Sequence, residues 1–282
     1  MQTYLTLPSP FNPEDTIHLL EPADADRNAV LRQVLSGEYA KPFVIDDADT
    51  RSLHFSLSLI QSTMQRRNAW ALELEYTQAM MSFWLFIPRP RRILMLGLGG
   101  GSLAKFCHRQ LPASEVCVVE IDPHVIAFRD LFDVPADGER FQIIEADGAA
   151  QVAEAARTGA RFDVVMMDAF DRYGLADSVS SAAFYRQVAE ILSGRGVMVA
   201  NLAGEKDARA EHLAMLGEAF DGRLLCINVP EGNDVVLAFA NPAFEPRWRE
   251  LANQAKELRK RSGLDFPKFV QWLERSQRHY WG

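Results

Sequence analysis

Two aspartates, Asp168 and Asp171, stand three residues apart directly after an apolar segment that begins at Phe162. A carboxylate can hold a cationic amine, remove its proton and free the nitrogen lone pair for attack on an electrophilic carbon. Burial and mutual repulsion of two neighbouring carboxylates would raise the pKa of one of them and improve it as a base. We therefore predict that both are catalytic and that Asp171 also holds the substrate. The alternative is a strand-end aspartate followed by a solvated loop aspartate.

A glycine-rich segment, Gly97-Leu-Gly-Gly-Gly101, follows the apolar run 93–96. Glycines let backbone N–H groups approach a ligand closely, and the helix N-terminus that follows favours negative or electron-rich groups. The spacing differs from the G-x-G-x-x-G dinucleotide fingerprint, because Ser102 stands where the third glycine would fall. We predict that Gly97, Gly99 and Gly101 bind a single nucleoside of the S-adenosylmethionine (SAM) type. The alternative is a glycine-rich turn without a ligand.

Acidic residues also follow two further apolar segments. Glu120 ends the segment that starts at Val116, and Asp147 with Gly148 follows 141–145. In an open parallel sheet, ligands bind beyond the carboxyl ends of the strands, so these side chains would face the glycine loop. We expect Glu120 to accept hydrogen bonds from the ribose hydroxyls and Asp147 to accept one from the adenine amino group, with Gly148 leaving room for the ring. Each acid alone is also consistent with helix capping, which aspartate does often.

The elements that position these residues alternate between strand and helix from Arg91 onward. Buried strands separated by helices are typical of a parallel sheet with both faces covered. Predicted strands lie at 93–96, 116–121, 141–145, 162–168 and 196–201, predicted helices at 102–110, 123–132, 149–156, 182–192 and 208–219, and a predicted hairpin at 224–229 and 234–240. Five such strands followed by a hairpin indicate a SAM-dependent methyltransferase-like (Rossmann-like) α/β domain over residues 89–282. Two further helices are predicted after residue 244.

Residues 1–88 are predicted to form a separate N-terminal region, a small β-rich lobe with one helix. Residues 1–40 are polar and rich in proline, so we expect irregular structure with a short helix near 26–35. Strands are predicted at 43–46 and 52–59, and residues 61–68 as a polar connection. The spacing of apolar residues predicts a helix over 72–86 that ends before Pro88.

Composition and charge narrow the classes of function. The net charge of −8 disfavours nucleic acid as a partner and is compatible with a cationic substrate. Three scattered cysteines without a C-x-x-C pair, and six histidines without ligand spacing, indicate neither a metal site nor a disulfide framework. No apolar run reaches membrane-spanning length and no signal-peptide pattern opens the chain, so we expect a cytoplasmic protein without a membrane partner.

In combination, these motifs resemble those of the polyamine aminopropyltransferases, the spermidine synthase family. The resemblance covers residues 40–240 and lies in the segments Val119-Glu-Ile-Asp122, Ala146-Asp-Gly148, Phe162-Asp-Val-Val-Met-Met-Asp-Ala-Phe-Asp171, Phe184-Tyr185 and Leu192-Ser-Gly-Arg-Gly-Val197. It implies a transferase with a SAM-type sulfonium donor, decarboxylated SAM being favoured, that alkylates a small-molecule amine such as a polyamine. A homodimer is implied by the resemblance alone.

The resemblance also implies roles for individual residues. Glu120 would bind the ribose and Asp147 the adenine, while Asp168 would act as the base on the amine and Asp171 would help to hold it. Gln61 aligns with a glutamine that the family places near the nucleoside. Tyr76 aligns with the tyrosine of the family's Y-x-E segment and would contact the substrate.

The sequence departs from the family pattern at the glycine loop. The family reads G-G-G-D-G-G, and Gly100 stands where its aspartate belongs. In the family this aspartate binds the amino group of decarboxylated SAM and disfavours the carboxylate of ordinary SAM, so its loss makes ordinary SAM admissible. Arg172 replaces a proline, and Asn201 replaces a glutamine after the fifth strand. Two alternatives therefore remain: a SAM-dependent methyltransferase and a non-catalytic nucleoside-binding protein.

Overall fold

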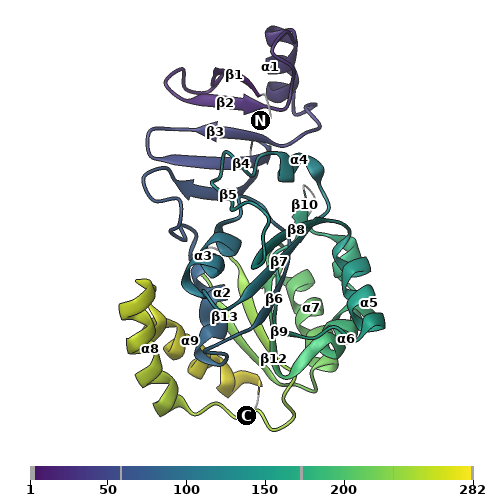
Figure 1. The fold of residues 1–282 in the computed structure, drawn as a ribbon, viewed down its shortest axis with the longest axis vertical. Helices are drawn as coiled ribbons and strands as arrows, with labels where there is room; N and C mark the ends of the chain where they lie inside the picture. Colours follow the sequence, from purple (N-terminus) through teal and green to yellow (C-terminus); the bar gives the residue numbers. More distant parts are fainter. Residues whose placement is uncertain (1–3, 58, 172–173, 231, 281–282) are drawn as a thin grey trace.

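The structure is a computed structural model of the 282-residue chain, and it describes residues 4–57, 59–171, 174–230 and 232–280. Figure 1 shows two sheets along the long axis of the molecule, with the N-terminal sheet at one end. The first sheet has five strands in the order β1-β2-β3-β4-β5, and the second has seven in the order β13-β14-β12-β9-β6-β7-β8. No helix in the described ranges is long and apolar enough to cross a membrane.

The seven-stranded sheet carries the site. Its strands are β6 (Arg92–Leu96), β7 (Glu115–Glu120), β8 (Phe141–Glu145), β9 (Phe162–Met167), β12 (Leu192–Leu202), β13 (Leu224–Asn228) and β14 (Asp234–Phe239). Strands β6, β7, β8, β9 and β12 pair in parallel, and β14 pairs antiparallel with both β12 and β13. The predicted fold is therefore confirmed. Strands β7 and β8 lie on one side of β6, and β9 and β12 lie on the other, so the direction in which successive strands are added reverses at β6. Ligands bind at such a reversal of strand order.

Helices cover both faces of this sheet (Figure 1). They are α3 (Ser102–Gln110), α4 (Pro123–Ala127), α5 (Gly148–Thr158), α6 (Ala182–Ile191), α7 (Lys206–Ala219), α8 (Trp248–Ser262) and α9 (Phe266–Tyr280). Alternate residues of β6 show the two faces: Ile93 and Met95 pack in the core with α3, α8 and α9, whereas Leu94 and Leu96 pack in the core with α5, α6 and α7. Such burial of both strand faces accounts for the continuous apolar runs in the sequence.

The N-terminal sheet is larger than the sequence indicated. It comprises β1 (Leu5–Pro8), β2 (Thr16–Leu19), β3 (Phe43–Asp46), β4 (Thr50–Ser56) and β5 (Leu59–Gln65), with α1 (Arg27–Ser36). The prediction of irregular structure before the first helix was wrong, because Leu5, Leu7, Ile17 and Leu19 alternate inward and are buried with the apolar side of α1. The predicted polar connection at 61–68 was also wrong: β5 is an edge strand that buries only alternate residues.

Two predicted helices are shorter than expected. The helix predicted over 72–86 consists of α2 (Glu75–Met80) followed by a 3-10 helix, η1 (Met81–Leu85), which ends before Pro88 as expected. The helix predicted over 123–132 ends at Ala127. Beyond it the chain continues in turns as far as Asp133, which has a positive φ of 52°. This segment, 127–134, packs against the glycine loop.

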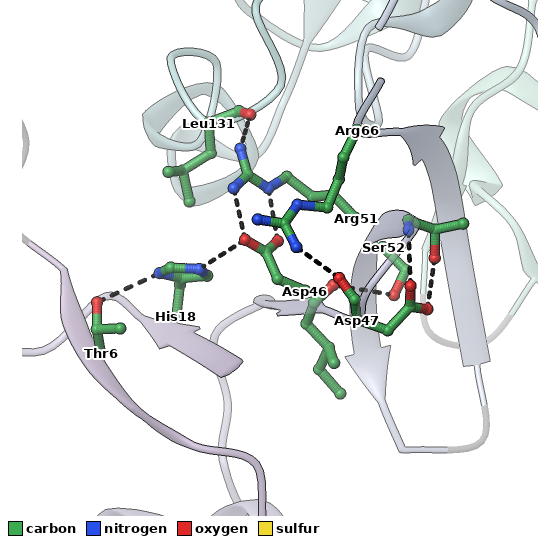
Figure 2. Close-up of polar contacts among 10 residues, drawn as sticks. Thr6, His18, Asp46, Asp47, Arg51, Ser52, Arg66 and Leu131 are labelled. Carbon is green, nitrogen blue, oxygen red and sulfur yellow. Dashed lines mark hydrogen bonds and ion pairs between the residues drawn. The ribbon is translucent and has the colours of Figure 1, made fainter. Parts of the chain in front are cut away.

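A polar cluster ties the N-terminal sheet together and connects it to segment 127–134 (Figure 2). Arg51 donates from Nε and Nη2 to the Asp46 carboxylate at 2.6 and 2.5 Å, and from Nη1 to the carbonyl of Leu131. His18 lies between Asp46 and Thr6, at 3.2 and 3.3 Å. Burial alone would raise the pKa of Asp46, but the hydrogen bonds from Arg51 and His18 outweigh it and hold that pKa well below its ordinary value. The cluster therefore joins four strands to the segment behind the glycine loop.

Candidate active site

A cavity of about 350 Å³ lies beyond the carboxyl ends of β6, β7 and β9. This volume is within the range of small-molecule sites. The cavity is lined by most of the residues that the sequence singled out, namely Gln61, Tyr76, Gly97, Gly99, Glu120, Asp147, Gly148 and Asp168. Gly101 is not among the lining residues, and the side chain of Asp171 lies outside the described part of the structure. The sequence thus located the cavity, while the role of each residue in it stays a prediction.

The glycine loop is shaped by close backbone contacts. Gly97 has a φ of 97°, and a Cβ there would lie 2.1 Å from the carbonyl oxygen of Asp168. The loop therefore crosses the end of β9 at a distance that only glycine permits. Gly101 has a φ of 69° and packs against Val134, whose Cγ2 would lie 2.5 Å from an added Cβ. Gly97 thus brings the loop against Asp168, and the chain turns into α3 at Gly101.

Glu120 fixes the loop from the neighbouring strand. One carboxylate oxygen accepts from the backbone N–H of Leu98 at 2.8 Å, and the other accepts from the N–H of Asp122 at 2.9 Å. Burial raises the pKa of Glu120, and these backbone hydrogen bonds act in the opposite direction. Each carboxylate oxygen has more than one lone pair, so the group can accept further hydrogen bonds from a ligand.

Asp147 both caps a helix and lines the cavity. Its Oδ1 accepts from the N–H of Ala150 at 2.8 Å, so it is the N-cap of α5, as the alternative interpretation held. Its carboxylate retains a second oxygen for a ligand, so capping and binding are compatible. Gly148, the first residue of α5, lies beside Val179: a Cβ there would be 3.2 Å from Val179 Cγ1. Gly148 therefore leaves space in the cavity wall next to Val179.

Asp168 lies where the loop, α2 and β12 meet. Its Oδ1 accepts from Asn201 Nδ2 at 2.9 Å, and its Oδ2 accepts from the Tyr76 hydroxyl at 3.3 Å. Burial raises the pKa of Asp168, and the two hydrogen bonds partly offset this rise. The expected pKa rise thus comes from burial. The contact with Tyr76 also places the first residues of α2 in the wall of the cavity.

Several residues of the site were not selected from the sequence. Ile121 follows Glu120 and lines the cavity with an apolar side chain that is 62% exposed. Ser62 lies on β5, in the segment expected to be a connection; the structure buries it and Met64 on one side of the strand, while Gln61 and Thr63 are only partly buried. Ser102 Oγ, also in the wall, is buried with no hydrogen-bond partner in the described chain. Over the same residues, no group of His, Cys, Asp or Glu is arranged to hold a metal ion.

The arrangement can hold a nucleoside and act on an amine. The loop and the carboxylates of Glu120 and Asp147 offer acceptors and backbone contacts to a ligand in the cavity, and Asp168 lines the cavity next to Gly97. Comparison with known proteins agrees with this geometry. A sequence profile of the spermine/spermidine synthase domain matches residues 73–215. The polyamine aminopropyltransferase of Chromobacterium violaceum is 34% identical over 83% of this chain and 89% of its own length. The chain belongs to the spermine/spermidine synthase family.

Solved structures with this fold include members of that family and of another. A probable spermidine synthase from Corynebacterium glutamicum has a TM-score of 0.64 at 19% identity, covering 82% of this chain and 91% of its own. Human methyltransferase-like protein 13, solved in complex with SAH, has a TM-score of 0.59 at 25% identity, covering 73% of this chain and 93% of its own. These two solved structures thus share the fold described above.

Proposed function

We propose that this protein is an aminopropyltransferase that uses decarboxylated SAM as donor and a small polyamine-type amine as acceptor. The observation that carries the proposal is the half-buried Asp168, held by Tyr76 and Asn201 in the wall of a cavity that also contains Glu120 and the glycine loop. Membership of the spermine/spermidine synthase family and the similarity to named polyamine aminopropyltransferases support it.

In the proposed reaction, the residues of the chain bind, orient and deprotonate. Glu120 accepts from the ribose hydroxyls and Asp147 from the adenine amino group. Asp168 takes one proton from the ammonium group of the acceptor, which leaves a neutral amine with a free lone pair. That nitrogen attacks the propyl carbon attached to the sulfonium. The C–N bond forms as the C–S bond breaks, the bonding electrons pass to sulfur, and methylthioadenosine and a protonated secondary amine are released.

The environment of Asp168 suits this role. Because burial raises its pKa, its carboxylate is a stronger base than a solvated aspartate. The hydrogen bonds from Tyr76 and Asn201 still favour the ionised form, which is the form that accepts a proton. Asp171, by resemblance, would hold the cationic acceptor next to it; this assignment stays a prediction.

Methyl transfer from ordinary SAM is a second candidate, favoured by one observation at the loop. A Cβ at Gly100 would lie 2.7 Å from Ser62 Oγ and 2.9 Å from Phe132 Cδ1, so the position that aligns with the family's aspartate has no room for a side chain. Helix α3 begins here without a side-chain cap and without an acidic residue in its first turn. The N–H groups of its first turn would favour the carboxylate that ordinary SAM carries.

The products distinguish the candidates. The protein is incubated with each donor and a diamine such as putrescine, and the nucleoside released is identified by mass spectrometry. Methylthioadenosine from decarboxylated SAM supports the proposal, and S-adenosylhomocysteine from SAM supports the second candidate. Release of neither product, with binding of either donor in calorimetry, would leave the non-catalytic alternative.

The variant Asp168→Asn tests the proposed base. We expect loss of turnover with donor binding retained, because asparagine keeps the shape of the side chain but cannot take the proton. The control is Asp163→Asn, on the same strand, where the carboxylate accepts from the backbone of Arg91 and Arg92 and does not line the cavity. Turnover by Asp168→Asn at the rate of the control would overturn the assignment.

A further inference from the structure

The side-chain amides of Asn201 and Asn233 form a chain of hydrogen bonds between Asp168 and the tip of the β13–β14 hairpin. Asn201 Nδ2 donates to Asp168 Oδ1 at 2.9 Å, and Asn233 Nδ2 donates to Asn201 Oδ1 at 2.9 Å. The sheet register explains the first contact: Ala200 of β12 pairs with Met167 of β9, so the next residue on each strand lies alongside the other. Asn201 is 2% exposed, and both ends of its amide are therefore occupied by protein groups.

The orientation of the Asn201 amide determines whether a hydrogen-bond donor or an acceptor faces the Asp168 carboxylate. An amide presents two donors at its nitrogen and an acceptor at its oxygen. With Asn233 donating to the oxygen, the nitrogen of Asn201 faces the carboxylate and stabilises its negative charge. In the reversed amide, the oxygen would face the Asp168 carboxylate and the two NH₂ groups would face each other. Both contacts would be repulsive, so the NH₂ of Asn233 selects the direction that favours the ionised base.

Asn233 is itself held in place by the hairpin. Its carbonyl accepts from the N–H of Val229 at 2.8 Å, which closes the turn. The next residue, Asp234, is fixed on both carboxylate oxygens: Asn228 Nδ2 donates to one at 2.6 Å, and Arg209 of α7 pairs with the other at 2.8 Å. The tip is therefore anchored to β13 and to α7 directly beside the residue that contacts Asn201.

We propose that Asn233 is a positioning residue: it sets the direction of the Asn201 amide, and through it the hydrogen bond that Asn201 donates to Asp168. The inference rests on the proposed function in taking Asp168 as the base. It assigns to the hairpin tip, whose described residues do not line the cavity, a part in keeping that base ionised.

The surroundings of Asp168 make the effect measurable. Burial raises its pKa, while the hydrogen bonds from Asn201 and Tyr76 lower it. Among the side chains that the structure describes, the titratable group in contact with it is Tyr76 of α2, and the other acids of the cavity walls are Glu120, Asp147 and Asp177. When Asn201 is removed, or its amide is reversed, the hydrogen bond that lowers the pKa of Asp168 is lost. The effect of burial then raises that pKa further, so the carboxyl group keeps its proton to a higher pH.

The test is a double-mutant cycle read by the titration of Asp168. Protein labelled with ¹³C at the aspartate carboxyl carbons is titrated by NMR, and the Asp168 signal is assigned by its loss in Asp168→Asn. Asn233→Ala should raise the midpoint by about one pH unit, the size of one charge-assisted hydrogen bond. Asn201→Leu should raise it at least as far. Adding Asn233→Ala to Asn201→Leu should have no further effect, because the influence of Asn233 passes through Asn201.

A control and an activity assay complete the design. Pro230→Ala changes an exposed residue of the same tip and should leave the midpoint unchanged. With decarboxylated SAM and putrescine, the acid limb of the kcat/KM profile should move with the NMR midpoint. An unchanged midpoint in Asn233→Ala, or an equal shift with and without Asn201, would overturn the inference. Absence of turnover in the unmodified protein would instead refute the proposed function, and the NMR titration would still decide the role of Asn233.

Discussion

Lys105 offers the sharpest test of the packing behind the glycine loop. This residue of α3 is 0% exposed, and its Nζ donates to the carbonyl of Phe132 at 2.6 Å and to Met64 Sδ at 3.0 Å. Burial lowers the pKa of Lys105 from 10.5 to about 8; the charge of Asp133 opposes the shift and that of Arg51 adds to it. We predict that Lys105 contributes a rise in the stability of the fold as the pH increases through the alkaline range.

The magnitude and sign follow from proton linkage. The pKa falls from 10.5 to about 8 on folding, a difference of 2.5 units, which corresponds to about 3 kcal/mol at 1.36 kcal/mol per unit. Between these pH values the unfolded chain binds the proton and the folded chain does not. The free energy of unfolding therefore rises with pH across this window. Below pH 8, Lys105 is protonated in both states, and the burial of its charge destabilises the fold by the full amount. Above pH 10.5, Lys105 is neutral in both states and this destabilisation is absent.

The assay compares the wild type with Lys105→Met, which keeps a long unbranched side chain without the charge. Urea unfolding is measured at intervals from pH 7 to 10.5, and the quantity of interest is the difference between the two proteins. Cys107 and Cys226, whose pKa values burial raises, also titrate at alkaline pH, but they do so equally in both proteins and cancel. We expect the wild type to gain about 3 kcal/mol relative to the variant over this range. A difference that is constant with pH, or that falls, would refute the reasoning.

Three further predictions concern the loop and the N-terminal sheet. Gly97→Ala forces a Cβ to 2.1 Å from the Asp168 carbonyl at a positive φ, so we expect a lower melting temperature and loss of nucleoside binding, measured by calorimetry. Gly100→Asp should fail to create a preference for decarboxylated SAM and should destabilise the fold, because a side chain at Gly100 has no room; a clear gain in that preference on titration would contradict this. Asp46→Asn should cost about 3 kcal/mol in urea unfolding at pH 7, because Arg51 loses its buried partner. Because folding lowers the pKa of Asp46, its ionised carboxylate contributes to the free energy of unfolding above pH 3.8, and this contribution is lost as the pH falls further. The difference in free energy of unfolding between wild type and variant should therefore decrease in acid.

The sequence predicted the elements that are buried on both sides. Strands β6, β7, β8 and β9 begin and end within one residue of the prediction, because fully buried parallel strands are continuous apolar runs. Strands β1 and β2 were missed because each has only four residues, too few for alternation to stand out among prolines. The helix predicted over 123–132 was too long because Phe128 and Phe132 have helical spacing, yet both are buried in turns, Phe132 against Gly100 and Phe128 against Tyr4.

In the site, too, features that depend on a local stretch of sequence were predicted, and those that depend on distant segments were not. Acids at strand ends were identified from their position relative to single apolar runs, which needs only local sequence. The partners of Asp168 depend on strand order instead: Tyr76 lies 92 residues away and Asn201 33 residues away. Asn201 was noted only because it differs from a glutamine of the family, and nothing in the chain near Asn233 indicates that its amide contacts Asn201 across the sheet.

The contacts behind the loop also bear on whether it can carry a negative side chain. Segment 127–134 presses Phe132 against Gly100, and it is held by Lys105 on one side and by the N-terminal sheet on the other. Tyr4, directly before β1, donates to the carbonyl of Ala127 at 2.8 Å, and Arg51 of β4 donates to that of Leu131. A negative side chain at the loop would need the segment to move outward, and moving it would break these contacts. A negative side chain at the loop would therefore oppose docking of the N-terminal sheet against segment 127–134.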